Sequence, residues 1–404
     1  MKWIKKIDGG IPVKLWCESI EKEAMQQAEN LARHPATFKH VALMPDCHVG
    51  YGMPIGGVIA CKNAVIPNAV GVDIGCGMVA VETNCPAEKF ADMKKRRNLL
   101  DSIKKSVPVG EGNSHNDEQS WNGFEKYIDS VKNPSKHEWP SRLDKKNLGT
   151  LGGGNHFIEL QQSENGMIWL MLHSGSRNLG YRVADYYHKR AISLNEKLNI
   201  ILPSKDLAFL PLDNEMALEY IRDMNFALAY ALENRHRMMT AFKNALASFV
   251  KDIKFEREIN IHHNYAALER HFGEDVWVHR KGATSAKKDE IGIIPGSMGT
   301  PSYIVKGLGN PESFMSCSHG AGRKMGRNEA SKNLSVEACD KAMEGIAFDR
   351  WNKYKSKWRK SAAKGLYDLS EAPLAYKDIE DVINSELDLI EPIVKLRPLG
   401  VLKG

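Results

Sequence analysis

Apolar and polar positions in the first hundred residues follow patterns that change from helical to extended. Segment 19–33 carries apolar residues every three or four positions, which predicts an amphipathic helix: Ile20, Ala24, Ala28 and Leu31. The pattern favours an extended strand at 40–50. Between 56 and 83, short apolar stretches are broken by Gly, Pro and Asn, which predicts strands joined by tight loops. Another amphipathic helix is expected at about 87–107.

The rest of the chain mixes both patterns, and one segment shows neither. Residues 108–147 are polar and without a clear period, which predicts an irregular excursion. The other expected elements are strands at 156–160 and 167–176, more than one helix within about 181–250, short strands with Gly-rich turns at 256–320, and helices at about 329–364 and 377–392. There is no internal repeat and no regular strand-helix alternation, so a single mixed α/β domain is predicted.

Composition narrows the class of protein. With 42% hydrophobic residues in 404, the chain is expected to be globular rather than disordered. No stretch is apolar enough for a membrane span and the start lacks a signal-peptide pattern, which predicts a cytoplasmic protein without a membrane partner. Seven scattered cysteines favour reduced thiols over a disulfide framework. The net charge of +6 is compatible with a polyanionic partner but identifies none.

A possible metal site stands out in the loop 69–78, AVGVDIGCGM. Asp73 and Cys76 are three residues apart among glycines, which let the backbone turn so that both side chains face one point. Five histidines in loops or at strand ends accompany them: His156, His173, His262, His263 and His319. Taken alone, a cysteine in a glycine loop is more often a buried small hydrophobic residue than a ligand, and a single histidine is as often a hydrogen-bonded core or surface residue as a ligand. Together they favour a site for a borderline divalent metal, in which a thiolate can bridge two ions.

Three glycine-rich segments carry exposed backbone N–H groups beside Ser, Asn or Arg donors. They are GTLGGGNHF, PGSMGTPSY and SHGAGRKMGR. Such turns favour anions, although a single one is usually a plain turn. None matches a Walker loop or a dinucleotide fingerprint, and the chain has no C-x-x-C pair or H-E-x-x-H motif. The segments therefore predict phosphate binding outside the common nucleotide folds.

With these segments assembled, the chain resembles the RtcB family of GTP-dependent RNA ligases. The motifs that carry the resemblance occur in the family's order: MPDCHVGYGMPIGGV, AVGVDIGCGM, LGTLGGGNHFIE, HSGSR, HHNY, RKGA, GIIPGSMGTPSYIV, SCSHGAGR and AYKDI. The resemblance implies one large domain over 1–404, of the α/β class (mixed α+β), with mixed sheets flanked by helices and the active site in a central cleft. Within this domain, the excursion at 108–147 is expected to be a lid or a surface decoration, and helices of the segment at about 181–250 are expected to pack on the core.

The resemblance also implies two manganese ions and a covalent nucleotide carrier. Asp73, Cys76 and His156 look like the ligands of one ion, and Cys76, His173 and His263 like those of the second. His319 resembles the nucleophile that takes a guanylate from GTP. The guanylate would pass to an RNA 3′-phosphate, formed where necessary from a 2′,3′-cyclic phosphate, and a 5′-hydroxyl would then displace GMP. The attacking imidazole must be neutral, and Asp46 is the predicted partner of its other nitrogen.

Guanylate contacts are implied at positions that match the family's motifs. They are Asn155, His156, Phe157, Ile158, Glu159, His263, Asn264, Pro295, Gly296, Ser297, Met298, Ser302, His319, Gly320, Ala321, Gly322 and Lys403. A carboxylate such as Glu159 can accept from the N1–H and amino group of guanine, which adenine does not offer as a pair. Lys403 can donate to a guanine oxygen or a phosphate.

RNA contacts are predicted at His48, Arg177, Arg323 and Arg327, which follow the metal or nucleophile motifs closely. The basic and aromatic segment 350–360 suits a solvated helix as well as a nucleic-acid surface. Cys47 stands where the family more often has a small or apolar residue, and it is either inert or a source of oxidation sensitivity.

Two other functions stay open at this point. The same metal site would serve a phosphoesterase acting on cyclic phosphate ends, and a degenerate site would leave an RNA-binding or chaperone-like protein. Retention of His319, Glu159 and Lys403 favours ligation. Transfer RNA halves, damaged ribosomal RNA and other cleaved RNAs present the same ends, and the sequence is compatible with an accessory activating protein or with none.

Overall fold

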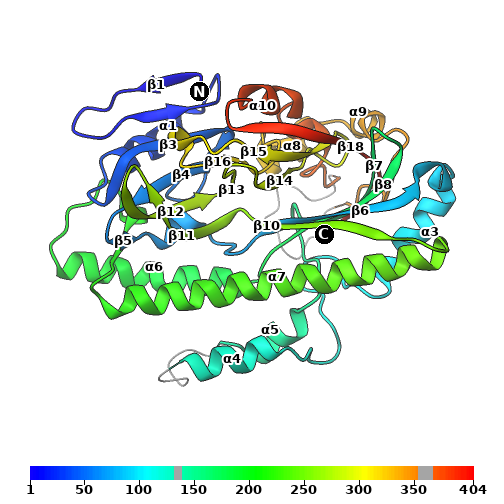
Figure 1. The fold of residues 1–404 in the computed structure, drawn as a ribbon, viewed down its shortest axis with the longest axis horizontal. Coiled ribbons are helices and arrows are strands. Elements are labelled where there is room, and N and C mark those ends of the chain that lie inside the picture. Colours follow the sequence, from blue (N-terminus) through cyan, green and yellow to red (C-terminus); the bar gives the residue numbers. More distant parts are fainter. Residues whose placement is uncertain (132–138, 354–366) are drawn as a thin grey trace.

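Two mixed β-sheets stacked above a pair of long helices make up the computed structural model of this chain (Figure 1). The structure describes residues 1–131, 139–353 and 367–404. The termini of the strands that carry the histidines meet between the two sheets, so the fold brings together residues far apart in the sequence. The predicted mixed α/β class is confirmed.

The first sheet has six strands and is built mainly from the N-terminal part of the chain. Its order is β1 (Trp3–Lys5), β2 (Val13–Leu15), β3 (Thr37–His48), β4 (Ile55–Cys61), β12 (Glu274–Lys281) and β11 (Asn264–His271). Strands β2 and β3 are parallel, with Val13 opposite Val41 and Leu15 opposite Leu43. This pairing carries Asp46, near the end of β3, toward the middle of the molecule.

The second sheet is larger. Its order is β10 (Phe255–His262), β6 (Gly77–Pro86), β8 (Met167–Ser174), β7 (Phe157–Ser163), β18 (Ile390–Lys403), β15 (Ser302–Gly307) and β14 (Ile291–Ile294), and β17 (Ala347–Phe348) pairs with β18. Two small ribbons join β13 (Ala283–Ser285) to β16 (Ser316–Ser318), and β5 (Ala64–Val65) to β9 (Leu210–Pro211). Alternate aliphatic residues of β6, β7 and β8 form one buried cluster with Met238, Met239 and Phe242 of α7, so one face of these strands packs on that helix.

The predicted helical segment at 181–250 consists of two helices, as expected: α6 (Leu179–Lys197) and α7 (Glu215–Phe249). They run side by side under both sheets (Figure 1). The other helices are α1 (Lys22–Ala32), α2 (Pro67–Val70), α3 (Met93–Lys104), α4 (Asn122–Ser130), α5 (Arg142–Asn147), α8 (Arg327–Asn333), α9 (Val336–Ala342) and α10 (Ile379–Ser385). No helix within the described ranges is long and apolar enough to cross a bilayer.

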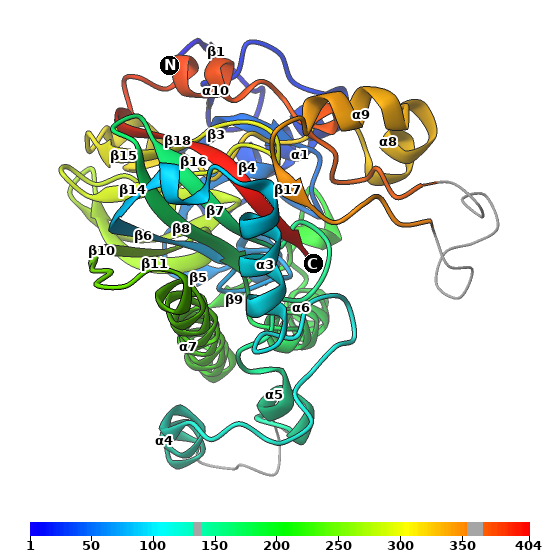
Figure 2. The ribbon, with the colours of Figure 1, turned by 90° about the vertical axis from the view of Figure 1, so that its right-hand side faces the viewer.

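The segment 108–147 is not wholly irregular, because it contains α4 and α5. Figure 2 shows both helices on the side of α7 that faces away from the sheets. The Tyr127 ring stacks on Phe226 of α7 at 4.0 Å between centroids, and its hydroxyl donates to the buried Asp223 at 2.9 Å. Two short helices offer too few turns for a periodic pattern, so tertiary contacts rather than sequence period explain their formation.

Two of the expected C-terminal helices are also shorter than predicted. The helix expected at 329–364 divides into α8 and α9, since the Ser335 hydroxyl accepts from the Ala338 N–H and starts a new helix; residues 354–364 lie outside the described part. The helix expected at 377–392 ends at Ser385. Strand β18 follows at once, and its Pro392 and Pro398 lie at irregular points of the pairing, where prolines are tolerated.

Candidate active site

A cavity opens where the two sheets face each other, and most of the predicted site residues line it. Its wall consists of His48, Ile55, Asn155, Phe157, His173, His263, Pro295, Gly296, Ser297, Met298, His319, Gly320, Ala321, Gly322, Arg323, Arg327, Tyr376 and Lys403. These residues come from both sheets and from the loops that follow their strands. The central cleft implied by the sequence is therefore present.

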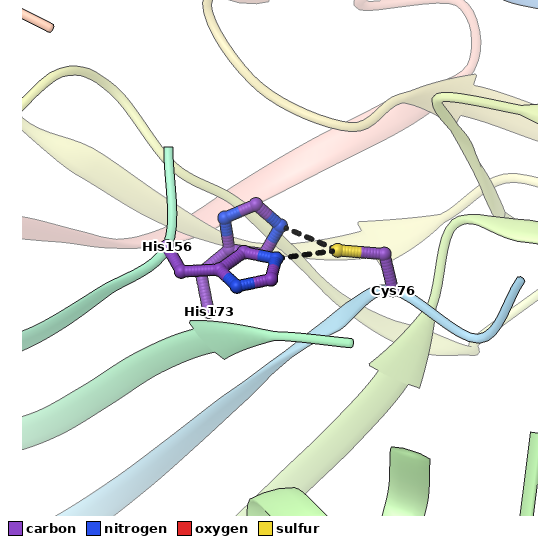
Figure 3. A group of neighbouring side chains, drawn as sticks. All are labelled: Cys76, His156 and His173. Atoms are coloured by element: carbon purple, nitrogen blue, oxygen red, sulfur yellow. Dashed lines mark hydrogen bonds between the residues drawn. The ribbon is translucent and has the colours of Figure 1, made fainter. Parts of the chain in front are cut away.

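Cys76, His156 and His173 form a compact cluster at one end of this cavity. The Cys76 sulfur lies 3.5 Å from His156 Nε2 and 3.1 Å from His173 Nε2. Figure 3 shows both rings turned toward the sulfur, His156 from the loop before β7, His173 from β8 and Cys76 from the loop before β6. All three side chains are buried, and their donor atoms lie close enough together to hold a metal ion.

Asp73 and His263 extend the cluster on either side. Asp73 Oδ2 is 3.4 Å from His156 Nε2, and His263 Nε2 is 3.3 Å from His173 Nε2. The tight loop before β6 depends on Gly75, whose φ of 81° suits glycine and whose Cβ, if present, would lie 2.9 Å from Ala231. The backbone of Gly175 passes so close to Asp73 that a Cβ there would lie 2.5 Å from its carboxylate. Glycines thus allow the carboxylate to reach the cluster.

The donor set and its spacing fit the implied metals. Two donors bound to one ion at about 2.1 to 2.3 Å lie about 3.0 to 3.6 Å apart for angles between 90° and tetrahedral. The four separations of 3.1 to 3.5 Å fall in this range. The Cys76 sulfur is in the middle of this row of donors, with His156 on one side and His173 on the other.

Hydrogen bonds from the far sides of the rings orient the imidazoles. His156 Nδ1 lies 2.9 Å from the Leu151 carbonyl, and His173 Nδ1 lies 3.2 Å from the Asn155 carbonyl. Both contacts require an N–H at Nδ1 and leave the Nε2 lone pairs directed at Cys76. Burial lowers the pKa of His173 and of His263 well below the usual range, so these rings are neutral, as ligands must be.

Charge at the cluster also favours a cation. Burial opposes ionisation of Asp73, but its contact with His156 and the charge of Arg177 lower its pKa to about 2. Burial and the Asp73 carboxylate raise the pKa of Cys76 well above its usual value. A bound cation is what would convert this thiol into the thiolate that ligates metal. Arg235, fully buried, donates to the Gly75 carbonyl at 2.7 Å, and its positive charge offsets part of the rise in the pKa of Cys76, which favours the thiolate form.

His319 lies next to this cluster, held by a buried carboxylate. Asp46 Oδ2 is 2.6 Å from His319 Nδ1 and also accepts from the His319 backbone N–H at 3.1 Å. The rings of His319 and His263 are 4.9 Å apart between centroids. With Nδ1 engaged by Asp46, Nε2 is the ring nitrogen of His319 that is free of this contact. The predicted pairing of Asp46 with His319 is thus present as a contact.

A second buried carboxyl group, which the sequence did not single out, holds the residue before His319. Glu386 Oε2 accepts from the Ser318 N–H at 2.9 Å, and Glu386 Oε1 accepts from the Ser318 hydroxyl. Burial raises the pKa of Glu386 to about 8; the contacts with Ser318 offset part of this effect, and the charge of Asp46 adds to it. Two acidic side chains therefore fix two consecutive residues of the loop that carries His319.

We expect Glu386 to make stability fall as pH rises from about 4.5 to about 8. In that window the unfolded chain loses the Glu386 proton while the folded protein retains it, so unfolding becomes more favourable. Relative to Glu386→Gln, the wild type should lose on the order of 3 kcal/mol between pH 5 and 8. Thermal unfolding of both proteins across this range measures the difference. Glu391 is exposed, so the control variant Glu391→Gln should keep the same pH dependence of stability as the wild type. If the difference in stability between the wild type and Glu386→Gln does not change with pH, the raised pKa of Glu386 is contradicted.

Some predicted guanylate residues lie behind the cavity wall rather than on it. They are His156, Ile158, Glu159, Asn264 and Ser302. Glu159 is buried, and burial raises its pKa to about 7, an effect that Lys403 and Gln161 reduce. Its Oε2 accepts from Gln161 Nε2 at 2.6 Å, and Gln161 in turn donates to Ser302 Oγ at 3.2 Å. Asn264 bridges the Asp73 carbonyl and the Gly282 N–H.

The side chains predicted to contact RNA differ in their exposure and in the contacts that they already make within the protein. Arg323 donates to the Ser370 carbonyl at 2.5 Å and also contacts Glu371 and Tyr376. Arg327 binds Glu371 at 2.9 Å, but its side chain is 45% exposed on the cavity rim. Burial lowers the pKa of His48 to about 4, so it lines the cavity as a neutral ring.

Arg177 has a φ of 53°, donates to Thr150 Oγ1 at 3.2 Å and is absent from this wall. Within the basic segment 350–360, Arg350 and Trp351 line an adjoining cleft, and residues 354–360 lie outside the described part.

Besides Glu386, three residues of this region were missed in the sequence. Ile55 and Tyr376 line the cavity, and both lie in motifs of the resemblance, MPIGGV and AYKDI, which was the available signal. Glu371 contacts Arg323, Arg327 and Tyr376 and lies 3.8 Å from Lys403 Nζ. No motif marked Glu371, because its role is to gather side chains from three separate segments, the stretch that holds Arg323 and Arg327, the one that holds Tyr376, and the one that holds Lys403.

A sequence model of the family described as tRNA-splicing ligase RtcB matches residues 27–404. The RNA-splicing ligase RtcB of Escherichia coli K12 is 41% identical over 97% of both chains. The tRNA-splicing ligases RtcB of Pyrobaculum aerophilum and Nanoarchaeum equitans are 31% and 32% identical, each over 98% of this chain and 95% of its relative. The match extends over the cavity, the histidine cluster and the His319 loop, and this chain belongs to the RtcB family.

Proposed function

We propose that this chain is a cytoplasmic RNA ligase that joins RNA 3′-phosphate or 2′,3′-cyclic phosphate ends to 5′-hydroxyl ends, in RNA splicing or repair, through a guanylate on His319. The observation that carries the proposal is the contact of His319 Nδ1 with Asp46 at 2.6 Å. It leaves Nε2 as the nucleophilic nitrogen of a ring on the wall of a cavity lined by Gly296, Gly320 and Gly322. The family membership and the names of the relatives support the same reaction class.

In the first step, His319 Nε2 attacks the α-phosphorus of GTP. A nitrogen–phosphorus bond forms, the bond from the α-phosphorus to the bridging oxygen breaks, and pyrophosphate leaves with the bond electrons. The ring becomes positively charged as it is guanylated, and Asp46, fully buried and adjacent to Nδ1, stabilises that charge. Asp46 also fixes the tautomer and the orientation of the ring.

In the next steps, the RNA 3′-phosphate attacks the guanylate phosphorus and releases His319. The RNA then ends in a diphosphate capped by guanosine. The 5′-hydroxyl of the second RNA attacks the 3′-phosphorus, a phosphodiester forms and GMP leaves. The hydroxyl proton must be accepted during this step, and His319, neutral again once deguanylated, offers its Nε2 on the cavity wall as the acceptor.

The implied cofactors are two Mn²⁺ ions held by the histidine cluster. Asp73, Cys76 and His156 would hold one, and Cys76, His173 and His263 the other. Bound there, the ions would supply Lewis-acid stabilisation of the phosphate charge. His173 of the cluster and its neighbour His263 also line the cavity wall, so phosphates bound in the cavity would lie next to the ions.

The guanine would lie toward the other end of the cavity. Lys403 Nζ donates to the Asn155 carbonyl at 3.2 Å, and its partly buried ammonium lies near Glu159 and Glu371. To accept hydrogen bonds from guanine, the Glu159 carboxylate must leave its contact with Gln161 and turn toward the cavity. Alternatively, Gln161 contacts the guanine and Glu159 orients Gln161. Arg327, with its exposed side chain on the rim, is the predicted RNA contact best placed to bind a phosphate.

A ligation assay tests the proposal. One RNA carries a labelled 3′-phosphate, the other a 5′-hydroxyl, and both are incubated with the chain, GTP and MnCl₂. We expect a joined product with the label in the junction phosphodiester, and none when the ends are 3′-hydroxyl and 5′-phosphate. Opening of a 2′,3′-cyclic phosphate without joining would favour the phosphoesterase alternative. Retention of RNA without any change in its ends would favour the RNA-binding alternative, and an accessory activating protein would raise the rate without changing the product.

A further inference from the structure

Two buried cysteine sulfurs touch each other beside the strand that carries Asp46. Cys17 follows β2, Cys47 lies in β3, and the two strands are parallel neighbours. The Cys47 thiol donates to Cys17 Sγ at 3.3 Å, and both residues are at most 3% exposed. The contact lies outside the histidine cluster and outside the wall of the candidate active site.

The surroundings of the pair give the two sulfurs different reactivity. The thiol of Cys47 lowers the pKa of Cys17 by hydrogen bonding; burial opposes this, and the charge of Lys377 lowers the pKa further. The same contact and burial raise the pKa of Cys47. Cys17 also lines a separate cleft together with Lys377, Lys324, Glu18 and Ser19, whereas Cys47 does not line it. Cys17 is thus the sulfur suited to react first.

We propose that Cys17 and Cys47 form an oxidisable dithiol that a peroxide converts to a disulfide. The Cys17 thiolate attacks one oxygen of hydrogen peroxide: a sulfur–oxygen bond forms, the oxygen–oxygen bond breaks, and the departing hydroxide takes a proton to become water. Cys47 then attacks the sulfur of the resulting sulfenic acid. The sulfur–sulfur bond forms, the sulfur–oxygen bond breaks, and a second water leaves with the Cys47 proton. Two thiols are oxidised and one peroxide is reduced.

The disulfide would alter the position of Asp46. The sulfurs must close from 3.3 Å to about 2.05 Å. Cys47 follows Asp46 directly in β3, and the Asp46 backbone packs so closely on Gly322 that a Cβ there would lie 2.3 Å from the Asp46 carbonyl oxygen. A strand packed this tightly transmits the shift to the Asp46 carboxylate and its contact with His319. This consequence rests on the proposed function, whereas the dithiol itself does not.

Peptide mass spectrometry tests the dithiol. The manganese-loaded chain is treated with hydrogen peroxide, alkylated, and digested with trypsin without reduction. We expect peptide 15–22, which contains Cys17, to be linked to peptide 40–62, which contains Cys47 and Cys61, with fragment ions placing the bond at Cys47. A Cys61→Ser control should keep the link and Cys17→Ser should abolish it. Recovery of Cys17 and Cys47 as alkylated thiols, or of Cys17 as a sulfinic acid without a link, overturns the proposal.

A guanylation assay tests the effect on Asp46. Peroxide should slow adduct formation by the wild type at least about tenfold, because a displacement of about 1 Å is enough to cause losses of this size. Dithiothreitol should restore the rate, and Cys17→Ser should be insensitive at the same dose. If peroxide slows adduct formation equally in the wild type and in Cys17→Ser, the inactivating oxidation occurs at another residue, for example Cys76. That result overturns the proposed effect of the disulfide on Asp46. Since the link is detected by mass, it is measurable even if the chain forms no guanylate.

Discussion

A His319→Ala variant will form no guanylate adduct when it is incubated with labelled GTP and MnCl₂, whereas the wild type will carry one acid-labile guanylate per chain. The variant lacks the nitrogen that bonds to phosphorus, so adduct formation and ligation should each fall at least about 1,000-fold. The adduct is measured by gel autoradiography after rapid alkaline quenching. His236→Ala, an exposed histidine on α7, is the matched control and should guanylate normally.

Asp46→Asn separates positioning from nucleophilicity. The amide keeps the size of the side chain but removes the charge that favours an N–H at His319 Nδ1. We expect the adduct to form, about 100- to 10,000-fold more slowly, by analogy with other carboxylate–imidazole pairs. A normal adduct in His319→Ala would refute His319 as the nucleophile. A normal rate in Asp46→Asn would refute only the role of Asp46.

A Cys76→Ala variant will lose bound manganese. The sulfur is in contact with both His156 and His173, and it is the donor placed to serve two ions. Its removal takes a ligand from each, so we expect the affinity for manganese to fall more than about 100-fold. The stoichiometry after gel filtration, measured by elemental analysis, should drop from the proposed number of about two ions per chain toward zero.

Cys85→Ala is the matched control for the metal experiment. Cys85 is as deeply buried and lies in β6, the strand that Cys76 precedes, but it lies outside the metal cluster. Its variant should retain manganese and unfold at a temperature close to that of Cys76→Ala in the presence of a chelator. If Cys76→Ala keeps its full manganese content, Cys76 is not a ligand. If the variant keeps one ion, Cys76 is a ligand of one metal only.

The sequence indicated the residues of the site better than it indicated their scaffold. Asp73, Cys76, His156 and His173 could be grouped because short glycine-rich loops mark places where the backbone approaches a ligand. The two helices within 181–250 could be predicted because their apolar periods are long. Asp46 was chosen as the partner of His319 on chemical grounds, and the 2.6 Å contact agrees with that choice.

What could not be predicted depends on contacts between distant segments. Strand β18 was missed because its prolines suggest a loop, and only the neighbouring strands stabilise it. Helices α4 and α5 form against α7, which no local pattern in 108–147 shows. Glu386 and Glu371 carry no motif, and the pairing of Cys17 with Cys47 follows from the register of β2 on β3.

The central place of β18 has a consequence for how the protein is made. It pairs with β7 on one side, with Leu396 opposite Ser163, and with β15 on the other, with Ser302 opposite Leu396. During synthesis β7 is therefore an open sheet edge until residues 390–403 emerge from the ribosome, and open edges invite pairing with other chains. Folding of this sheet is expected to be late and slow. Fast translation or crowded expression should accordingly yield aggregates joined along β7.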